Sequence, residues 1–277
     1  MPFKQKLAKA TKISASKLPS SYQTVGHVLL LKLPSIKSPK QKKKIAQAIL
    51  SLLPYVKTVC EIKEISGELR EPVIDVLAGN GTITTHKENE ILYKLDAAKI
   101  MFSKGNLNER KRIIGQVKDG ELIIDMFAGI GYFSLGLAKH SKAREIIAIE
   151  KNPEAYNYFV ENIALNKLNN VSAMQGDCTV AAGALRGMAD RIIMGYFPGT
   201  ENFLSYALLM AKNGCMIHYH NIYRTKELWK KPLGEISEVS KKFNLSFQIL
   251  TKKKVKSYAP NVWHVVVDFQ VFRGRNV

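Results

Sequence analysis

A buried strand, a glycine turn and a helix in succession constrain this chain more than any other feature. The apolar run at 121–125 ends in Asp125, and a turn with Gly129 and Gly131 precedes the next helical pattern. A second apolar run ends in Glu150. Such glycines let the backbone approach a ligand, and an acid ending the second strand accepts hydrogen bonds from ribose hydroxyls. The segment therefore predicts a Rossmann-like domain with a nucleoside-binding pocket.

The order of elements after residue 120 predicts the fold class. Apolar patterns predict strands at 121–127, 145–150, 171–174, 190–196, 214–220, 245–251 and 262–272, and helices at 132–140, 153–166, 201–212 and 226–243. Alternating strands and helices give a parallel sheet covered on both faces. The last two strands are joined too directly for a crossover, so they form an antiparallel hairpin at the sheet end. We expect an α/β fold with a class I methyltransferase-like Rossmann sheet.

Three segments are expected along the chain. Residues 1–20 form a basic arm that is partly helical or flexible, residues 21–100 form a small α/β domain, and residues 101–277 form the Rossmann-like domain. In the small domain the patterns predict a strand at 25–33, a helix at 43–53, strands at 56–62 and 73–77, and a hairpin of 82–85 with 91–95. Residues 97–112 are expected to be a connector.

Positive charge is concentrated at the two ends of the chain. The formal net charge is +19, and residues 1–60 contain twelve lysines and no acid. A solubilising surface or a loose tail would explain this, and so would a surface that binds phosphates. An anionic membrane surface would also attract such a concentration of positive charge. However, no interfacial amphipathic helix with aromatic anchors is evident in the sequence, and this favours nucleic acid as the binding partner.

Other classes of protein receive no support from the sequence. No apolar run approaches the ~20 residues of a membrane span, and the first residues lack a signal-peptide core. Cys60, Cys178 and Cys215 are far apart and odd in number, so neither a zinc motif nor a disulfide framework follows. We expect a cytoplasmic, monomeric protein without a metal or a membrane partner.

Three acids are expected at the carboxyl ends of neighbouring strands. Asp125, Glu150 and Asp177 each follow or end a predicted strand, and in an open α/β sheet such positions line one crevice. Carboxylates without a metal motif suit a ligand with hydroxyl and amine donors and a positive centre, as in S-adenosylmethionine. Ser134 replaces the third glycine of a dinucleotide fingerprint, which weakens an NAD interpretation. The simpler alternative is that Asp125 and Asp177 cap helices.

Further polar and aromatic residues are candidates for the acceptor side of a site. His218 and His220 alternate on one strand and so face one side, where they suit a hydrogen-bonding pair better than a metal site. Tyr196 and Tyr223 are candidates for stacking a base. Ser103 and Arg110 precede the first Rossmann strand and could hold a carboxylate.

Several short motifs together resemble the archaeal wybutosine-pathway aminocarboxypropyltransferases. The resemblance covers about 26–272, and its motifs begin at Met101, Asp125, Ile149, Glu161, Asp190, Ile217 and Tyr258. The related tRNA guanine-37 N1-methyltransferases differ from this chain in two motifs. They have Asn-Pro-Pro-Tyr or Asn-Leu-Pro where this chain has Met194-Gly195-Tyr196. They have Ser-Pro-Arg where this chain has Ser103-Lys104-Gly105. Phe197-Pro198-Gly199 departs from the transferase pattern.

The resemblance implies transfer of the 3-amino-3-carboxypropyl group of S-adenosylmethionine to C7 of 4-demethylwyosine at position 37 of phenylalanine tRNA. It places Ser103, Arg110, Glu150, Asp177 and Cys178 at the cofactor. The full set predicted to bind the cofactor is Ser103, Arg110, Asp125, Phe127, Gly129, Gly131, Glu150, Lys151, Asp177, Cys178 and Gly195. The set predicted to bind the tRNA substrate at its anticodon loop is Tyr196, His218, His220, Tyr223, Lys42, Lys43, Lys44 and Lys253.

Two other functions remain open at this point. A methyltransferase acting on tRNA would have the same fold, and a non-enzymatic RNA-binding protein would have the same charge. The sulfonium has three carbons open to displacement, so geometry selects which group is transferred. The acceptor ring is electron-rich, and no catalytic acid or base is predicted.

Overall fold

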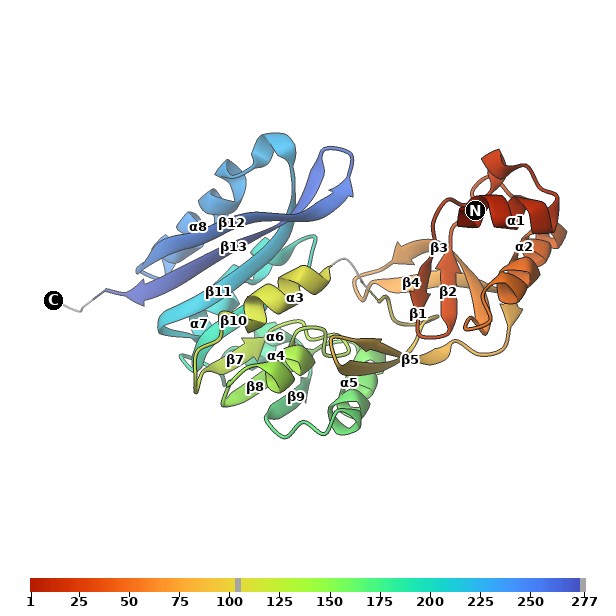
Figure 1. Cartoon of the computed structure of the whole chain (residues 1–277). Coiled ribbons are helices and arrows are strands. Elements are labelled where there is room, and N and C mark those ends of the chain that lie inside the picture. Colours follow the sequence, from red (N-terminus) through yellow and green to blue (C-terminus); the bar gives the residue numbers. More distant parts are fainter. Residues whose placement is uncertain (103–105, 275–277) are drawn as a thin grey trace. The chain divides into compact units, whose positions relative to one another are not determined.

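The computed structural model of the chain describes residues 1–102 and 106–274. The chain divides into two compact units, residues 1–103 and 104–277 (Figure 1).

The first unit is a four-stranded sheet with two helices and a separate hairpin. The sheet has the order β1-β2-β3-β4, and its strands are β1 (Gln23–Val25), β2 (Val28–Leu31), β3 (Thr58–Ser66) and β4 (Glu71–Gly79). Helices α1 (Phe3–Thr11) and α2 (Pro39–Leu52) pack with it, a short 3-10 turn η1 (Ala15–Lys17) follows α1, and β5 (Ile83–Glu88) pairs with β6 (Ile91–Asp96). Helix α2 begins where Ser38 accepts a hydrogen bond from the Gln41 amide and Pro39 supplies a preset φ.

Two features of the first unit differ from the sequence prediction. The segment predicted as a basic arm contains α1, whose Leu7 is fully buried in one core with Ile45 and Ile49 of α2. The strand predicted at 25–33 is the shorter β2, which pairs antiparallel with a further strand, β1, that begins before it and was not predicted. They are joined through Gly26, which has a φ of +53° and where a Cβ atom would lie 2.1 Å from Thr84 Oγ1. Only glycine fits this turn. The hairpin of β5 and β6 is confirmed.

The second unit contains a seven-stranded mixed sheet of order β12-β13-β11-β10-β7-β8-β9. Its strands are β7 (Leu122–Asp125), β8 (Glu145–Glu150), β9 (Val171–Gln175), β10 (Ala189–Met194), β11 (Ala211–Arg224), β12 (Leu245–Ala259) and β13 (Val262–Arg273). The five strands from β9 to β11 are parallel, and β13 is antiparallel to both β11 and β12. The predicted fold class and its terminal hairpin are confirmed.

Helix α3 (Leu107–Ile114) precedes the sheet. The parallel strands are connected by α4 (Ser134–His140), α5 (Pro153–Leu165), α6 (Cys178–Ala181) and α7 (Leu204–Met210), and α8 (Lys230–Lys242) leads from β11 to β12. Two short 3-10 turns are η3 (Thr200–Phe203) and η4 (Thr225–Glu227). Helix α3 begins in the predicted connector at 97–112 and extends two residues beyond it, and the short α6 was also missed. The helix predicted at 201–212 is divided between η3 and α7.

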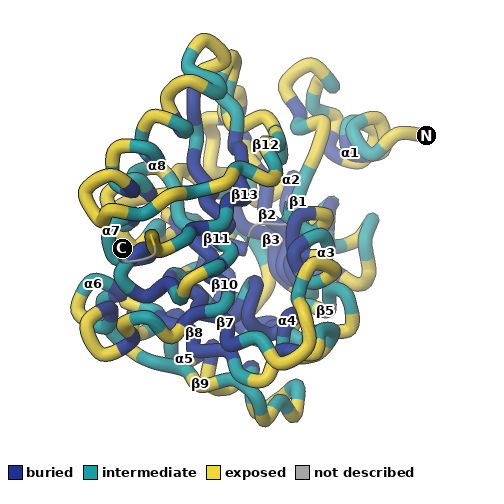
Figure 2. Tube along the Cα trace, turned by 90° about the vertical axis from the view of Figure 1, so that its left-hand side faces the viewer, coloured by how far each residue is buried: buried dark blue, intermediate teal, exposed yellow. Residues whose placement is uncertain are grey.

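Burial falls from the centre of this sheet toward its β12 edge (Figure 2). Most side chains of β10 and of the middle of β13 are buried, whereas β12 alternates between half-buried and exposed residues. The central strands therefore form a rigid base for the loops at their carboxyl ends. Among the described residues, no helix is long and apolar enough to cross a membrane.

Candidate functional site

The glycine turn after β7 has a conformation that other residues could not adopt easily. Gly129 and Gly131 have φ values of +58° and +95°. A Cβ atom on Gly131 would lie 2.5 Å from the Leu135 side chain, and one on Gly129 would lie 2.5 Å from the Tyr132 ring. The Ala128 amide donates to the Ile149 carbonyl at 2.9 Å, which fixes the turn beside β8. The backbone is thus held in a compact turn at the carboxyl end of the sheet.

Glu150 ends β8 against this turn. Its Oε2 accepts a hydrogen bond from the Gly129 amide at 2.6 Å, and its Oε1 accepts one from the Asn152 amide at 2.7 Å. Burial raises the pKa of Glu150, although these backbone bonds oppose the rise. A carboxylate has about four lone-pair directions, so Glu150 keeps the capacity to accept from a further hydroxyl donor. The arrangement fits a ribose diol.

Asp177 lies at the end of the next strand, β9, and caps α6. Its Oδ1 accepts hydrogen bonds from the Thr179 amide and hydroxyl at 2.9 and 2.7 Å, and these bonds lower its pKa. Lys151 Nζ lies 3.1 Å from Asp177 Oδ2. Burial raises the pKa of the neighbouring Cys178 thiol to about 12. Asp177 is therefore a helix cap, and it also borders the same strand ends as Glu150.

Asp125 has a different environment from the other two acids. It is fully buried, its Oδ2 accepts from the Ser134 hydroxyl at 2.7 Å, and its Oδ1 accepts from the Phe127 amide at 3.3 Å. Burial raises its pKa to about 6. Its role in cofactor binding stays a prediction, and the geometry favours an indirect one in which Asp125 fixes the glycine turn to the start of α4.

Aromatic rings gather beyond the carboxyl end of β10. Phe127 stacks on Tyr196 with ring centroids 5.2 Å apart, and its ring meets the edge of Phe203 at 5.0 Å. A Cβ atom on Gly195 would approach the Phe133 ring to 3.0 Å. The predicted residues Phe127, Gly195 and Tyr196 therefore lie together, next to the glycine turn.

Arg110 reaches the same turn from α3. Its guanidinium lies over the ring of Tyr132, 5.2 Å from the ring centroid, and the residue is buried. The geometry is compatible with the predicted carboxylate clamp. Ser103, the other predicted member of that clamp, lies outside the described residues.

His218 and Tyr223 of β11 are both buried and bonded within the protein. His218 Nδ1 donates to Asp268 at 2.7 Å, and its Nε2 accepts from Arg191 at 2.7 Å. On the other face of β11, the Tyr223 hydroxyl bonds to Tyr219 and Glu235. Substrate contact by either residue stays a prediction, and these bonds favour structural roles for both.

A buried ionic network surrounds His218, and sequence reasoning missed it. Arg191 pairs with Glu121 at 2.6 Å, and Arg112 pairs with both Glu109 and Asp268 at 2.5 Å. Burial alone would raise the pKa of Asp268, but the bond from His218 and the charge of Arg112 hold it below its ordinary value. The network ties α3, β10, β11 and β13 together.

His220 contacts a third histidine that the sequence did not suggest. Its Nδ1 lies 3.1 Å from Nε2 of His264 on β13. The Phe197 ring stacks on His264 at 4.2 Å, and the Phe133 ring lies 5.7 Å from His220. The histidine pair is therefore adjacent to Phe133, which follows the glycine turn after β7, and to Phe197 in the loop after β10.

The four lysines predicted to bind tRNA have unlike surroundings. Lys42 forms an ion pair of 2.6 Å with the buried Glu61, whereas Lys43 and Lys44 are exposed on α2. Lys253 Nζ lies 3.6 Å from Glu109 Oε2. Lys43 and Lys44 are consequently the two whose charges face solvent.

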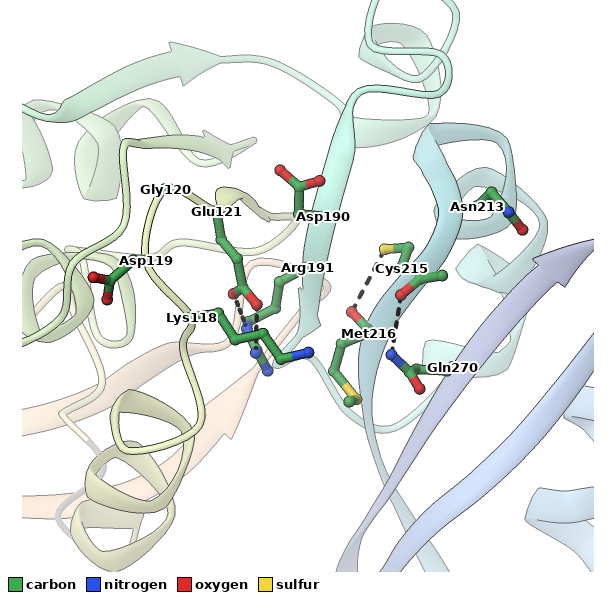
Figure 3. Close-up of a pocket in the computed structure, with 11 residues that line it drawn as sticks. Lys118, Asp119, Gly120, Glu121, Asp190, Arg191, Asn213, Cys215, Met216 and Gln270 are labelled. Carbon is green, nitrogen blue, oxygen red and sulfur yellow. Dashed lines mark hydrogen bonds and ion pairs between the residues drawn. The ribbon is translucent and has the colours of Figure 1, made fainter.

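A cavity of about 290 Å³ lies at the opposite edge of the sheet (Figure 3). Its lining comes from the segment before β7 and from the amino ends of β10 and β11, and it includes Glu121, Arg191 and Gln270. Glu121 and Arg191 pair with each other there, and Gln270 donates to the Gly214 carbonyl at 3.1 Å. Ligands of open α/β sheets bind at the carboxyl strand ends, so this cavity is not the candidate site.

The residues at the carboxyl ends of the parallel strands, here called the carboxyl edge, suit a ligand that contains adenosine and a sulfonium group. Glu150 retains acceptor capacity, the glycine turn leaves backbone accessible, and aromatic rings lie alongside. Two family models match the chain: the TRM5/TYW2 methyltransferase domain over residues 84–249 and the TYW2 N-terminal domain over residues 4–82.

The chain belongs to the TRM5/TYW2 family. Within it, the chain is 44% identical over 93% of its length to the tRNA(Phe) (4-demethylwyosine(37)-C(7)) aminocarboxypropyltransferase of Pyrococcus horikoshii, and it covers 91% of that protein. It is 36% identical to the tRNA (guanine(37)-N(1))-methyltransferase Trm5b of Pyrococcus abyssi, with 92% of this chain and 76% of that protein covered.

Solved structures of the family match the same fold. P. horikoshii TYW2 in complex with MeSAdo has a TM-score of 0.85 and 39% identity, with 98% of this chain and all of that chain covered. M. jannaschii TYW2 in complex with AdoMet has a TM-score of 0.74 and 36% identity, with 92% of this chain and 100% of that chain covered. Among the described residues of this family member, no cluster of three His, Cys, Asp or Glu side chains is arranged to hold a metal ion.

Proposed function

We propose that this protein transfers the 3-amino-3-carboxypropyl group of S-adenosylmethionine to C7 of 4-demethylwyosine at position 37 of tRNA(Phe). The observation that carries the proposal is the similarity to a named aminocarboxypropyltransferase over nearly the whole of both chains. The carboxyl-edge site supports it, because its acids and glycine turn suit this donor. The tRNA substrate makes a cytoplasmic location part of the proposal.

Each part of the site has a separate task in this proposal. Glu150 binds the ribose hydroxyls, Asp177 and Cys178 border the adenine, and Arg110 holds the carboxylate of the amino-acid arm. The bound donor supplies an electrophilic carbon next to a positive sulfur. Which of the three carbons reacts depends on which one the protein places ~3–3.5 Å from the acceptor. Arg110, buried beside the turn, would hold the aminocarboxypropyl arm on the acceptor side.

Methyl transfer to tRNA is the second candidate function, since Trm5b relatives share the fold at 36% identity. A relative from Saccharolobus solfataricus, the tRNA 4-demethylwyosine(37)-methyltransferase Taw21, is 32% identical over 90% of this chain and 92% of that protein. The higher identity to the aminocarboxypropyltransferases favours the first candidate.

Two isotopic labels in the donor separate these candidates. The protein is incubated with tRNA(Phe) containing 4-demethylwyosine and with S-adenosylmethionine labelled either in the methyl group or in the carboxyl group. The proposal expects the carboxyl label, and not the methyl label, to enter the tRNA. Entry of the methyl label alone would show a methyltransferase, and entry of neither label would overturn both activities.

A further inference from the structure

Two buried histidines beside the site have unused hydrogen-bonding atoms. His220 is 1% exposed and His264 is 0% exposed, and they bond to each other through His220 Nδ1 and His264 Nε2. The outer nitrogens, His220 Nε2 and His264 Nδ1, make no hydrogen bond with any other described residue. A buried polar atom without a hydrogen-bond partner destabilises the folded protein. Two buried nitrogens that make no hydrogen bond call for an explanation.

The neighbours of the pair come from α3, from the start of α4 after the glycine turn, and from the loop after β10. Glu109 Oε1, on α3, lies 3.9 Å from His220 Nε2, and Arg110 follows it on the same helix. Phe133 follows the glycine turn, and the half-buried Phe197 covers His264 from the loop after β10. The charged groups around the pair also include Arg112, Lys253 and Lys256, and His218 lies two residues along β11.

The bond between the two rings couples their protonation. Burial lowers the pKa of His220 to about 3 and that of His264 to about 2, so both rings are neutral at neutral pH. A neutral imidazole has one N–H and one bare nitrogen. When His220 Nδ1 donates to His264 Nε2, His220 Nε2 is bare and can accept a proton. The imidazolium so formed would lie near the carboxylate of Glu109.

The proposed reaction releases a proton that needs an acceptor. C7 of the base forms a bond to the methylene carbon beside sulfur, the carbon–sulfur bond breaks, and its electron pair stays on the sulfur of the leaving thioether. The alkylated ring then carries a positive charge, and it becomes neutral when the C7–H bond breaks. Two carboxylates on the other side of the site already have partners in the proposed function, since Glu150 binds the ribose hydroxyls and Asp177 binds Thr179 and Lys151.

We infer that His220 Nε2 accepts the C7 proton and that His264 is the positioning residue that keeps this nitrogen bare. The C7–H electron pair returns to the ring, and the proton forms a new N–H bond on His220. The inference rests on the proposed function, because only transfer to a ring carbon bearing hydrogen requires this step. It adds a base to a site in which the sequence predicted none.

A deuterium isotope effect tests the inference. tRNA(Phe) is prepared with hydrogen or deuterium at C7 of 4-demethylwyosine, and single-turnover transfer is compared for the wild-type protein, His220→Gln, His264→Phe and His264→Gln. The wild-type protein should show no isotope effect, because loss of the proton is faster than formation of the carbon–carbon bond. His220→Gln should react about 10²-fold more slowly, with a normal isotope effect and little change in KM for tRNA. His264→Phe should behave similarly, and His264→Gln, which can still accept from His220 Nδ1, should restore part of the rate.

His218→Asn is the matched control, since it removes a buried histidine from the same strand. It should lower stability in urea without producing an isotope effect. Imidazole NMR spectra of histidine-labelled protein, recorded without either substrate, should show a proton on Nδ1 of His220 and none on Nε2.

A fast His220→Gln variant, a slow variant without an isotope effect, or a proton on His220 Nε2 would each overturn the role of His220. Failure of the wild-type protein to add the aminocarboxypropyl group would instead overturn the proposed function.

Discussion

At the residue scale, we expect binding of the donor to depend on Glu150, whose carboxylate accepts hydrogen bonds from the Gly129 and Asn152 amides. Glu150→Gln should weaken S-adenosylmethionine binding by about 10-fold or more, because hydrogen bonds to a charged group contribute about 1.5–3 kcal/mol. Titration calorimetry measures this affinity. Glu145→Gln, at the other end of β8, is the control and should bind normally. Equal affinities in the two variants would show that Glu150 does not bind the donor.

Asp125 should make stability depend on pH. Its pKa in the folded protein, about 6, lies above its ordinary value of 3.8. The folded state therefore keeps the proton to higher pH, and stability falls as pH rises through this range. Asp125→Asn has no proton to lose; its amide oxygen can still accept from the Phe127 amide, and its NH2 group can donate to the Ser134 hydroxyl. Between about pH 4 and about pH 7 the wild-type protein should lose about 2 kcal/mol relative to the variant, measured by urea unfolding. Parallel pH profiles would contradict the assignment.

The sequence identified the residues at the strand ends but not their individual tasks. Glu150 and the two glycines could be predicted because strand, turn and acid occur in one short segment. The burial of Asp125 and the bonds of His218 depend on Ser134, Arg191 and Asp268, and such contacts over long sequence separations leave no local pattern. His264 was missed for the same reason.

At the element scale, α3 is joined to β11 and β13 by buried charges. Asp268→Asn should destabilise the protein by about 3–5 kcal/mol, because it leaves Arg112 buried without its full compensation. Asp119→Asn is the control: its pair with Lys142 is about three-quarters exposed, and exposed pairs contribute only about 0–1 kcal/mol. Urea unfolding measures both variants. Equal and small losses would mean that the network does not stabilise the second unit.

The elements of the second unit were predicted well because each parallel strand is a short apolar run between helical patterns. The terminal hairpin followed from a connection too short for a crossover. Helix α3 was missed because its sequence is mostly polar, and its helical face is defined by ion pairs with β13 that the periodicity of apolar residues cannot reveal. In the first unit, the sequence of α1 resembles a basic tail, and only the structure shows that its Leu7 is buried in the core.

At the scale of the whole molecule, the excess of lysine should appear as salt-dependent tRNA binding. Replacing both Lys43 and Lys44 by alanine should reduce the slope of log affinity against log salt by about two, one for each phosphate contact. Lys42→Ala is the control, because Lys42 is paired with Glu61 and should leave the slope unchanged. Fluorescence anisotropy with tRNA(Phe) over a range of salt measures the slope. An unchanged slope in the double variant would exclude these lysines from the interface.

The fold by itself does not distinguish an aminocarboxypropyltransferase from a methyltransferase, because both occur in this family on the same sheet. In the proposed function, the distinction depends on how the second unit orients the donor. We expect Arg110, whose guanidinium lies over the Tyr132 ring beside the glycine turn, to contribute to that orientation.

The most direct measurement is the mass of the modified nucleoside. tRNA(Phe) carrying 4-demethylwyosine is treated with the protein and S-adenosylmethionine, digested, and analysed by mass spectrometry. The account predicts that the nucleoside gains the mass of one aminocarboxypropyl group and that methylthioadenosine appears in equal amount. A gain of one methyl group, with S-adenosylhomocysteine as the second product, would contradict it.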